Sequence, residues 1–323
     1  MNATTTTVFV SGVDGYIAQH ILIDLLDKGY KVIGSVRSSS KGDDLIQKLQ
    51  DVKLPFENFK YVVVPEIGTP GAFDNALKEN PDISVFLHTA SPFRLDVTDI
   101  EQEILLPAIN GIKNALLSAE KYASNLKHFV LTSSFAAIGG FGKSLSDPLE
   151  GYLGSKKFAE QAAWELWAET DAGFQLTSVN PPYVFGPQAF GVKDSTQMNT
   201  SVETVNALLK MNPKDSIPGL KHLFVDVRDV SKAHLEAFEN PEAVGKRLFI
   251  TNGQWSYQGM ANIIHENFKE LTNVPVGEPE KDEVLKKEAF KFDNSKTMNV
   301  LHTSLIPFEQ SIIDTVEQIV AAC

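Results

Sequence analysis

The most informative segment for the fold is Val8-Phe9-Val10-Ser11-Gly12-Val13-Asp14-Gly15-Tyr16-Ile17-Ala18. A β-branched and aromatic run stops at a glycine turn, and apolar residues then continue at helical spacing. This order predicts a strand, a tight turn and a helix, which together bring backbone N–H groups and the positive end of a helix to one place. Such a place binds pyrophosphate. A glycine turn that opens a buried helix can also be purely structural, so the spacing Gly-x-x-Gly-x-x-Ala needs support from the rest of the chain.

The first half of the chain alternates between apolar β-type runs and helical patterns. The predicted strands are residues 7–10, 31–36, 59–64, 83–88, 128–132 and 175–180. The predicted helices are residues 18–28, 43–50, 72–79, 98–122 and 152–170. Strands this apolar, separated by helices, are typical of a parallel sheet that is covered on both faces. The sequence therefore predicts an α/β, Rossmann-type, doubly wound parallel sheet, with ligands beyond the carboxyl ends of its strands.

The second half is less regular, because the prolines of the segment 180–187 exclude a helix interior there. Further strands are expected at 223–227 and 246–250, with helices between and after them. We expect residues 1–181 and 221–251 to form an NADP-binding Rossmann domain. Residues 182–220 and 252–323 are then expected to form a second, smaller C-terminal substrate-binding domain.

Composition limits the possible partners. The chain has 323 residues and a formal net charge of −12, which argues against nucleic acid and anionic membrane surfaces. No apolar run reaches the roughly 20 residues that a membrane span needs. The first residues lack a secretory signal, and the only cysteine is Cys323. We expect a cytoplasmic protein with no nucleic-acid partner, no membrane partner and no metal site. The acidic motif Asp226-x-Arg228-Asp229 is interpreted as a helix cap with an ion pair.

The residues after the second predicted strand indicate which cofactor binds. NAD enzymes usually place a carboxylate there to bind the ribose 2′-hydroxyl group. Here the segment begins with Arg37 and continues to Lys41 without an acidic residue. Two cations in one turn suit a 2′-phosphate group, although they also fit a solvated basic loop. The sequence favours NADPH.

Tyr152 and Lys156 lie four residues apart on a predicted helix, and therefore on one helical face. An ammonium group beside a phenol lowers its pKa from about 10 and makes it a usable proton donor. Ser133 and Ser134 end the preceding strand and offer a hydroxyl group that holds a carbonyl oxygen. Such a pair also occurs by chance in many helices, but here it follows the glycine turn and a basic second strand end.

Taken together, these motifs resemble the extended short-chain dehydrogenases/reductases of the dihydroflavonol-reductase-like branch, along essentially the whole chain. Within it, the chain most resembles yeast NADPH-dependent carbonyl reductases that act on methylglyoxal, 3-methylbutanal and assorted ketones. The resemblance implies a catalytic triad of Ser134, Tyr152 and Lys156. It also implies cofactor contacts, which are Gly12, Val13, Asp14, Gly15, Tyr16, Ile17, Arg37, Lys41, Glu66, Ile67, Ala90, Tyr152, Lys156, Val184 and Ser201.

Aromatic residues near these motifs are candidates for an apolar substrate pocket, namely Phe93, Phe135 and Tyr183. One departure from the relatives is the segment between Ser134 and Tyr152, where they carry a longer loop.

The expected function is an NADPH-dependent reductase that transfers hydride to aldehydes and ketones and forms chiral alcohols. A nucleotide-sugar epimerase or dehydratase of the same fold is an alternative, and a non-catalytic NADP-sensing regulator is another. The expected partner is a small carbonyl compound, and the expected oligomeric state is a monomer or a homodimer.

Overall fold

The computed structural model describes residues 2–91, 97–139, 147–191 and 198–322. The chain divides into two units. The first comprises Met1–Asn180 and Ser231–Phe249, and the second comprises Pro181–Val230 and Ile250–Cys323. In the described part of the chain, we find no helix with both the length and the apolar character needed to cross a membrane.

A seven-stranded parallel sheet forms the centre of the first unit. Its strands are β1 (Thr7–Ser11), β2 (Lys31–Val36), β3 (Phe59–Val63), β4 (Ile83–His88), β5 (His128–Thr132), β6 (Gln175–Asn180) and β9 (Arg247–Phe249). Their order is β3-β2-β1-β4-β5-β6-β9, so the direction of winding reverses between β1 and β4. This sheet confirms the predicted Rossmann-type α/β fold, and it places the carboxyl ends of β1 and β4 at the switch point where such folds bind ligands.

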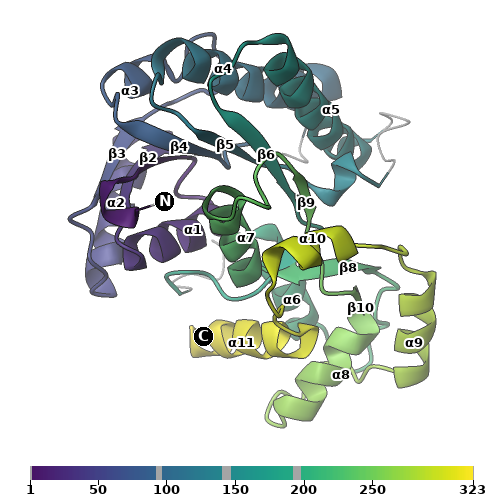
Figure 1. Ribbon diagram of the computed structural model, residues 1–323. Helices are drawn as coiled ribbons and strands as arrows, with labels where there is room; N and C mark the ends of the chain where they lie inside the picture. The colour runs from purple at the N-terminus through teal and green to yellow at the C-terminus, as the bar shows by residue number, and fades with distance from the viewer. Residues whose placement is uncertain (1, 92–96, 140–146, 192–197, 323) are drawn as a thin grey trace. The chain divides into compact units, whose positions relative to one another are not determined.

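Helices cover both faces of this sheet. They are α1 (Tyr16–Asp27), α2 (Ser39–Asp51), α3 (Asp74–Lys78), α4 (Leu106–Tyr122), α5 (Pro148–Glu169) and α7 (Val227–Glu239). Two short 3-10 helices, η1 (Ala3–Thr5) and η3 (Phe135–Ala137), and one π-helical segment, η2 (Glu101–Leu105), precede or join them. Figure 1 shows α3, α4 and α5 over one face, and α1 and α7 over the other. Strands that are buried on both faces explain why their sequences are apolar throughout.

The core under α3 and α4 is aromatic. Phe9 and Phe86 lie edge to face with their ring centres 4.7 Å apart, and Phe129 packs on Phe86 at the same separation. Phe73 closes the cluster from the segment before α3. All four rings are fully buried. Together they join β1, β4 and β5, which are the strands whose ends carry the candidate site.

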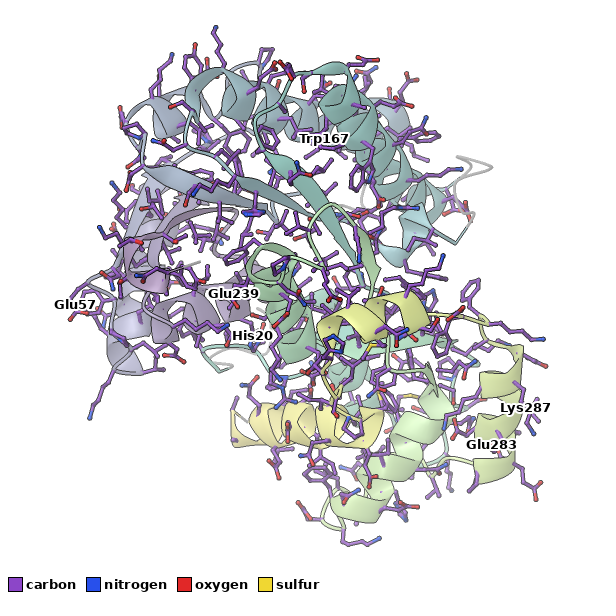
Figure 2. The ribbon with its side chains drawn as sticks, viewed as in Figure 1. His20, Glu57, Trp167, Glu239, Glu283 and Lys287 are labelled. Carbon is purple, nitrogen blue, oxygen red and sulfur yellow. The ribbon has the colours of Figure 1, made fainter. Side chains whose placement is uncertain are left out.

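On the opposite face, two carboxylates fasten α7 to α1. Asp24 of α1 accepts a 2.5 Å hydrogen bond from Ser231 Oγ. Glu239, at the end of α7, accepts bonds from Lys28 Nζ at 2.6 Å and from Tyr30 Oη at 2.7 Å. Figure 2 labels Glu239 beside α1. These contacts close the first unit around the returning chain.

The second unit contains a three-stranded sheet of order β10-β8-β7. Its strands are β7 (Tyr183–Phe185), β8 (Lys221–Asp226) and β10 (Gln254–Ser256). Its helices are α6 (Thr200–Leu209), α8 (Tyr257–Asn267), α9 (Pro279–Glu288), α10 (Ser295–Leu301) and α11 (Phe308–Ala321). Here the structure corrects the expected boundary: residues 221–230 belong to this unit, because β8 pairs with β7 and β10.

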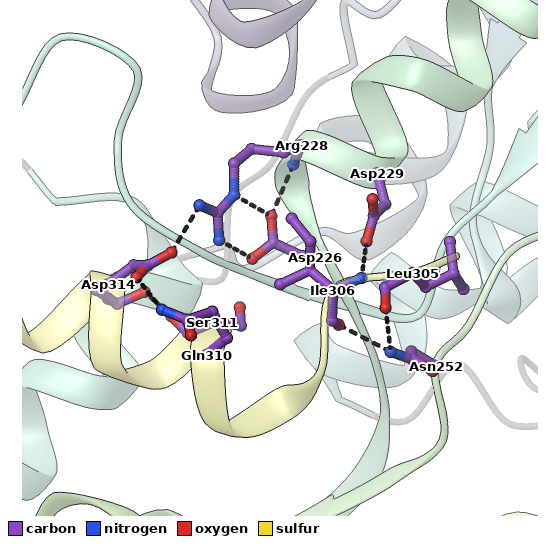
Figure 3. Close-up of polar contacts among 10 residues, drawn as sticks. Asp226, Arg228, Asp229, Asn252, Leu305, Ile306, Gln310, Ser311 and Asp314 are labelled. Carbon is purple, nitrogen blue, oxygen red and sulfur yellow. Dashed lines mark hydrogen bonds and ion pairs between the residues drawn. The ribbon is translucent and has the colours of Figure 1, made fainter. Parts of the chain in front are cut away.

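The motif Asp226-x-Arg228-Asp229 fastens the end of β8 to the last helix (Figure 3). Asp226 accepts the Arg228 backbone N–H at 2.9 Å and binds its guanidinium through two bonds of 2.8 Å. Arg228 Nη1 also donates to Asp314 of α11 at 2.6 Å. Asp229 accepts the backbone N–H of Ile306 at 2.6 Å. The motif therefore forms the cap and ion pair expected of it, and it anchors the chain that leads into α11.

Candidate active site

The glycine turn lies at the carboxyl end of β1, against the end of β4. Gly12 has φ +63°, a conformation that favours glycine, and a Cβ atom added there would lie 3.1 Å from Ala90. Gly15 is the N-cap of α1 and brings no capping side chain. The positive end of α1 therefore meets the turn, as an anion-binding site requires.

Two serines hold this turn in shape. Ser35 of β2 accepts the Gly12 N–H with its hydroxyl at 3.1 Å and the Val13 N–H with its carbonyl at 3.0 Å. Ser11 Oγ accepts the backbone N–H groups of Thr89 and Ala90, both at 3.1 Å. The structure thus brings Gly12 and Ala90 together, two residues that the sequence pairs only through a resemblance.

The basic residues after β2 border the same turn. Lys41, in the first part of α2, places its ammonium nitrogen 3.4 Å from the Asp14 carboxylate. Arg37 is exposed and follows β2 directly. Because Asp14 belongs to the glycine turn, at least one of the two predicted cations lies at the turn itself.

The loop after β3 is fixed to α4. Asn114 of α4 donates to the Ile67 carbonyl at 3.0 Å, and Gly111 allows the Ile67 side chain to approach the helix closely. Glu66 is exposed, and its carboxylate accepts the N–H of Gly68 at 3.0 Å. Both predicted contacts therefore lie in a loop whose backbone is held in place.

Tyr152 and Lys156 occupy the N-terminal half of α5. The Lys156 ammonium nitrogen lies 5.9 Å from the centre of the Tyr152 ring, within reach of a cation–π contact. Asp147 caps α5 by accepting the N–H groups of Leu149 and Glu150 at 2.9 and 3.0 Å. Gly151 lets the helix approach Ile100, because a Cβ atom there would lie 2.3 Å from that side chain. The predicted pair is therefore placed by a well-capped and closely packed helix.

Burial shapes the electrostatics beneath this pair. It lowers the pKa of Lys156 to about 8, so the ammonium form still prevails at neutral pH. Burial, together with the charge of Lys156, lowers the pKa of His88 to about 3. His88 is 3% exposed and its Nδ1 lies 3.0 Å from Ser11 Oγ, so it is a neutral core histidine rather than a base. His88 is therefore neutral, and Lys156 is a charged group beside the Tyr152 ring.

Ser134 follows β5 at the same edge of the sheet. Its backbone is extended, and its hydroxyl oxygen accepts the Ala136 N–H at 3.1 Å, which caps η3. A hydroxyl group that accepts in this way still carries its own O–H donor. The turn η3 packs against α5. Ser134 is therefore fixed in a segment that contacts the helix of Tyr152 and Lys156.

Glu160, a buried acid near the three predicted catalytic residues, was not predicted from the sequence. Glu160 of α5 accepts bonds from Asn180 Nδ2 and Arg247 Nε, each at 2.5 Å, and also from Ser133 Oγ. Only its spacing could have indicated it, because Glu160 follows Lys156 by four residues and therefore lies on the same helical face.

The other predicted residues lie in the second unit, in the core of the first unit or outside the described residues. Tyr183 and Val184 lie in β7, and Ser201 lies in α6. All three belong to the second unit. Phe135 is 7% exposed and stacks on Phe249 with ring centres 5.3 Å apart. Phe93 and the segment 140–146, which contains the departure from the relatives, lie outside the described residues.

Comparison with known proteins identifies the family. The model of the NAD dependent epimerase/dehydratase family matches residues 8–250. The NADPH-dependent methylglyoxal reductase GRE2 of Saccharomyces cerevisiae is 41% identical over 338 residues, which cover 97% of this chain and 98% of that protein.

Solved structures agree with that match. The crystal structure of Gre2 from Candida albicans in complex with NADPH has a TM-score of 0.92 at 42% identity, covering 98% of this chain and 99% of that one. The yeast methylglyoxal/isovaleraldehyde reductase Gre2 complexed with NADPH has a TM-score of 0.91 at 40% identity, with 98% of each chain covered. The chain belongs to the NAD dependent epimerase/dehydratase family, the extended short-chain dehydrogenases/reductases.

Proposed function

We propose that this protein is an NADPH-dependent carbonyl reductase that converts aldehydes and ketones to alcohols. The observation that carries the proposal is the pair of Tyr152 and Lys156 on α5, with the ammonium nitrogen 5.9 Å from the ring centre. The similarity along the whole chain to NADPH-dependent methylglyoxal reductases supports it. Substrates of the same class, small aldehydes such as methylglyoxal and 3-methylbutanal together with medium-sized ketones, are the first to test.

The first unit fits the cofactor. At Gly12 the backbone of the turn lies close to Ala90, so that an added Cβ atom would be 3.1 Å away, and the positive end of α1 lies beside it. This arrangement suits a pyrophosphate group. Lys41 and Arg37 supply positive charge at the end of β2 for a 2′-phosphate group. NADPH, when bound, supplies the hydride that reduces the carbonyl carbon.

The residues of the triad then manage the proton and the developing negative charge. Tyr152 donates its phenolic proton to the oxygen that becomes an alkoxide, which completes the alcohol. The Ser134 hydroxyl donates a hydrogen bond to the same oxygen and stabilises its charge. Lys156 remains protonated at neutral pH and favours the phenolate that Tyr152 leaves behind.

The remaining assignments extend this proposal. We assign cofactor contacts to the glycine turn from Gly12 to Ile17, to Glu66 and Ile67, and to Ala90. The second unit would contribute Val184 and Ser201 to the cofactor and Tyr183 to the substrate, as the substrate-binding domain. A cytoplasmic location, a monomer or homodimer, and the absence of a nucleic-acid partner remain predictions.

The test is a panel of carbonyl compounds in which NADPH consumption is followed by absorbance, with chiral analysis of the alcohols. We expect turnover of several small aldehydes and ketones with NADPH and much slower turnover with NADH. An epimerase or dehydratase would instead convert nucleotide sugars without net consumption of NADPH. Conversion of nucleotide sugars, combined with inactivity toward every carbonyl compound, would overturn the proposal.

A further inference from the structure

Glu160 is a buried carboxylate one helical turn beyond Lys156. Only 2% of its surface is exposed. Tyr152, Lys156 and Glu160 follow one another at intervals of four residues, so they project from one side of α5. A buried carboxylate is costly unless hydrogen bonds compensate for the lost water, so its partners explain why it is tolerated.

Four donors converge on the two oxygens of Glu160. Oε1 accepts a bond from Arg247 Nε at 2.5 Å and a longer one from Trp164 Nε1 at 3.3 Å. Oε2 accepts a bond from Asn180 Nδ2 at 2.5 Å and another from Ser133 Oγ. Three of these donors come from the sheet side: Ser133 follows β5, Asn180 ends β6 and Arg247 begins β9. Glu160 therefore ties α5 to the ends of three neighbouring strands.

The same network reaches Ser134 from both sides. Ser133 is its immediate neighbour in the chain. Asn180 Nδ2, which binds Glu160, also donates to the Ser134 carbonyl at 3.1 Å. Arg247 Nη2 donates at 3.3 Å to the carbonyl of Ala137, in the turn that Ser134 caps. The backbone around Ser134 is thus bound to a side chain from the helix that carries Tyr152 and Lys156.

We propose that Glu160 is a positioning residue, which sets the separation between Ser134 and the Tyr152–Lys156 pair. The inference rests on the proposed carbonyl reduction. A shift of α5 along its axis would move the Tyr152 hydroxyl and the Lys156 ammonium together relative to the Ser134 hydroxyl. Displacements of about 1 Å at a reacting centre reduce rates by about 100-fold, so small losses in this network should be measurable in turnover.

The alternative is that Glu160 contributes to folding stability alone. Glu160→Gln separates the two roles because it preserves the size of the side chain. Its amide nitrogen replaces one oxygen and thereby faces two hydrogen-bond donors instead of accepting from them. Glu239→Gln is the matched control. Glu239 lies at the end of α7 in the first unit, and its carboxylate also accepts hydrogen bonds from two side chains, Lys28 and Tyr30. Figure 2 labels this control position.

For Glu160→Gln we expect kcat to fall by about 10- to 100-fold, while the Kd for NADPH stays within about twofold of the wild-type value. The basic limb of the pH profile of kcat should shift, because the surroundings of the Tyr152 phenol change. Glu239→Gln should lower the Tm and leave kcat and the pH profile unchanged. If Glu160→Gln lowers the Tm but keeps the wild-type kcat and pH profile, the positioning role is overturned.

Ser133→Ala provides a second variant if Glu160→Gln does not fold. It removes one donor and leaves the carboxylate with Asn180 and Arg247, so a smaller loss of kcat with the same shift of the pH profile is expected. A wild-type pH profile and kcat in Ser133→Ala would then count against the role.

A separate readout distinguishes failure of this inference from failure of the proposed function. The phenolate of Tyr152 is followed by ultraviolet absorbance as the difference between the protein and its Tyr152→Phe variant, both saturated with NADP⁺. If the wild-type protein reduces no carbonyl compound, the proposed function fails. The titration still decides the inference, because a Tyr152 pKa that is identical with and without the Glu160→Gln change contradicts it.

Discussion

The Lys156 ammonium nitrogen and the Tyr152 ring lie 5.9 Å apart on consecutive turns of α5. Burial has already lowered the pKa of Lys156 to about 8, which is close enough to neutrality for the group to respond to its surroundings. The tyrosine thus has a cation beside it whose charge persists at pH 7 and disappears in mildly alkaline solution. Carbonyl reduction by this pair should therefore weaken as the pH rises above about 8.

Tyr152→Phe removes the proposed proton donor while preserving the ring. We expect kcat to fall by about 100- to 10,000-fold, because general acid catalysis contributes on that scale. The Kd for NADPH, measured by quenching of protein fluorescence, should change little. Tyr122→Phe, at the end of α4, is the control and should keep full turnover. Substantial turnover in Tyr152→Phe would remove the tyrosine from the mechanism.

Acid should destabilise the protein through His88. Its pKa is lowered to about 3 in the folded protein, against about 6.5 in the unfolded chain. Between these values the unfolded chain binds a proton that the folded protein does not, so stability falls as the pH falls. From about pH 6.5 to 5, the contribution of His88 to the free energy of unfolding should decrease by about 2 kcal/mol.

Denaturant unfolding at several pH values tests this linkage. His88→Gln should flatten the dependence of the unfolding free energy on pH between about 6.5 and 5. The control His302→Asn changes an exposed histidine of the second unit and should keep the wild-type slope. Equal slopes in His88→Gln and the wild-type protein would contradict the assignment.

Gly12→Ala combines two penalties at the cofactor turn. Alanine is strained at φ +63°, and its Cβ atom would lie 3.1 Å from Ala90. We expect a loss of about 1–3 kcal/mol in the free energy of unfolding and a clear loss of NADPH affinity. Gly29→Ala is the matched control, because Gly29 has φ +84° with open space around it. Gly29→Ala should lower the free energy of unfolding through the same kind of backbone strain, but it should keep the wild-type affinity for NADPH.

Arg37→Ala should weaken the binding of NADPH much more than the binding of NADH. The guanidinium group is proposed to bind the 2′-phosphate group that NADH lacks, and a charge-assisted hydrogen bond contributes about 1.5–3 kcal/mol, or roughly 10- to 100-fold in Kd. The measurement compares the Kd for each nucleotide. Lys31→Ala, at the opposite end of β2, should leave both values unchanged. An equal effect of Arg37→Ala on the two nucleotides would contradict the role of Arg37.

The sequence predicts those parts of the molecule whose chemistry is local. The apolar runs, the glycine turn and the Tyr152–Lys156 spacing can be recognised in the sequence, because each depends on residues only a few positions apart. The predicted helix at 98–122 is observed as a π-helical segment, η2, that continues directly into α4, and Pro107 in the first turn of α4 has no backbone N–H to donate. The change from π to α geometry was not predicted.

Features that depend on partners far away in the chain could not be predicted from the sequence. Strand β8 has the same apolar character as the strands of the large sheet, and only its pairing with β7 and β10 assigns it to the second unit. Glu160 resembles any charged residue on a helix surface, since its partners Asn180 and Arg247 are 20 and 87 positions away. Sequence patterns carry no local signal for such contacts.

The discontinuity of the first unit has a consequence during protein synthesis. Strand β9 is residues Arg247–Phe249, so β6 remains the outer strand of the sheet while the ribosome adds the 181–230 segment. An outer strand with unpaired backbone groups is a template for association between nascent chains. Pauses in translation between residues 181 and 249 prolong this exposure and should therefore lower the yield of native protein, whereas pauses placed after residue 249 should have little effect.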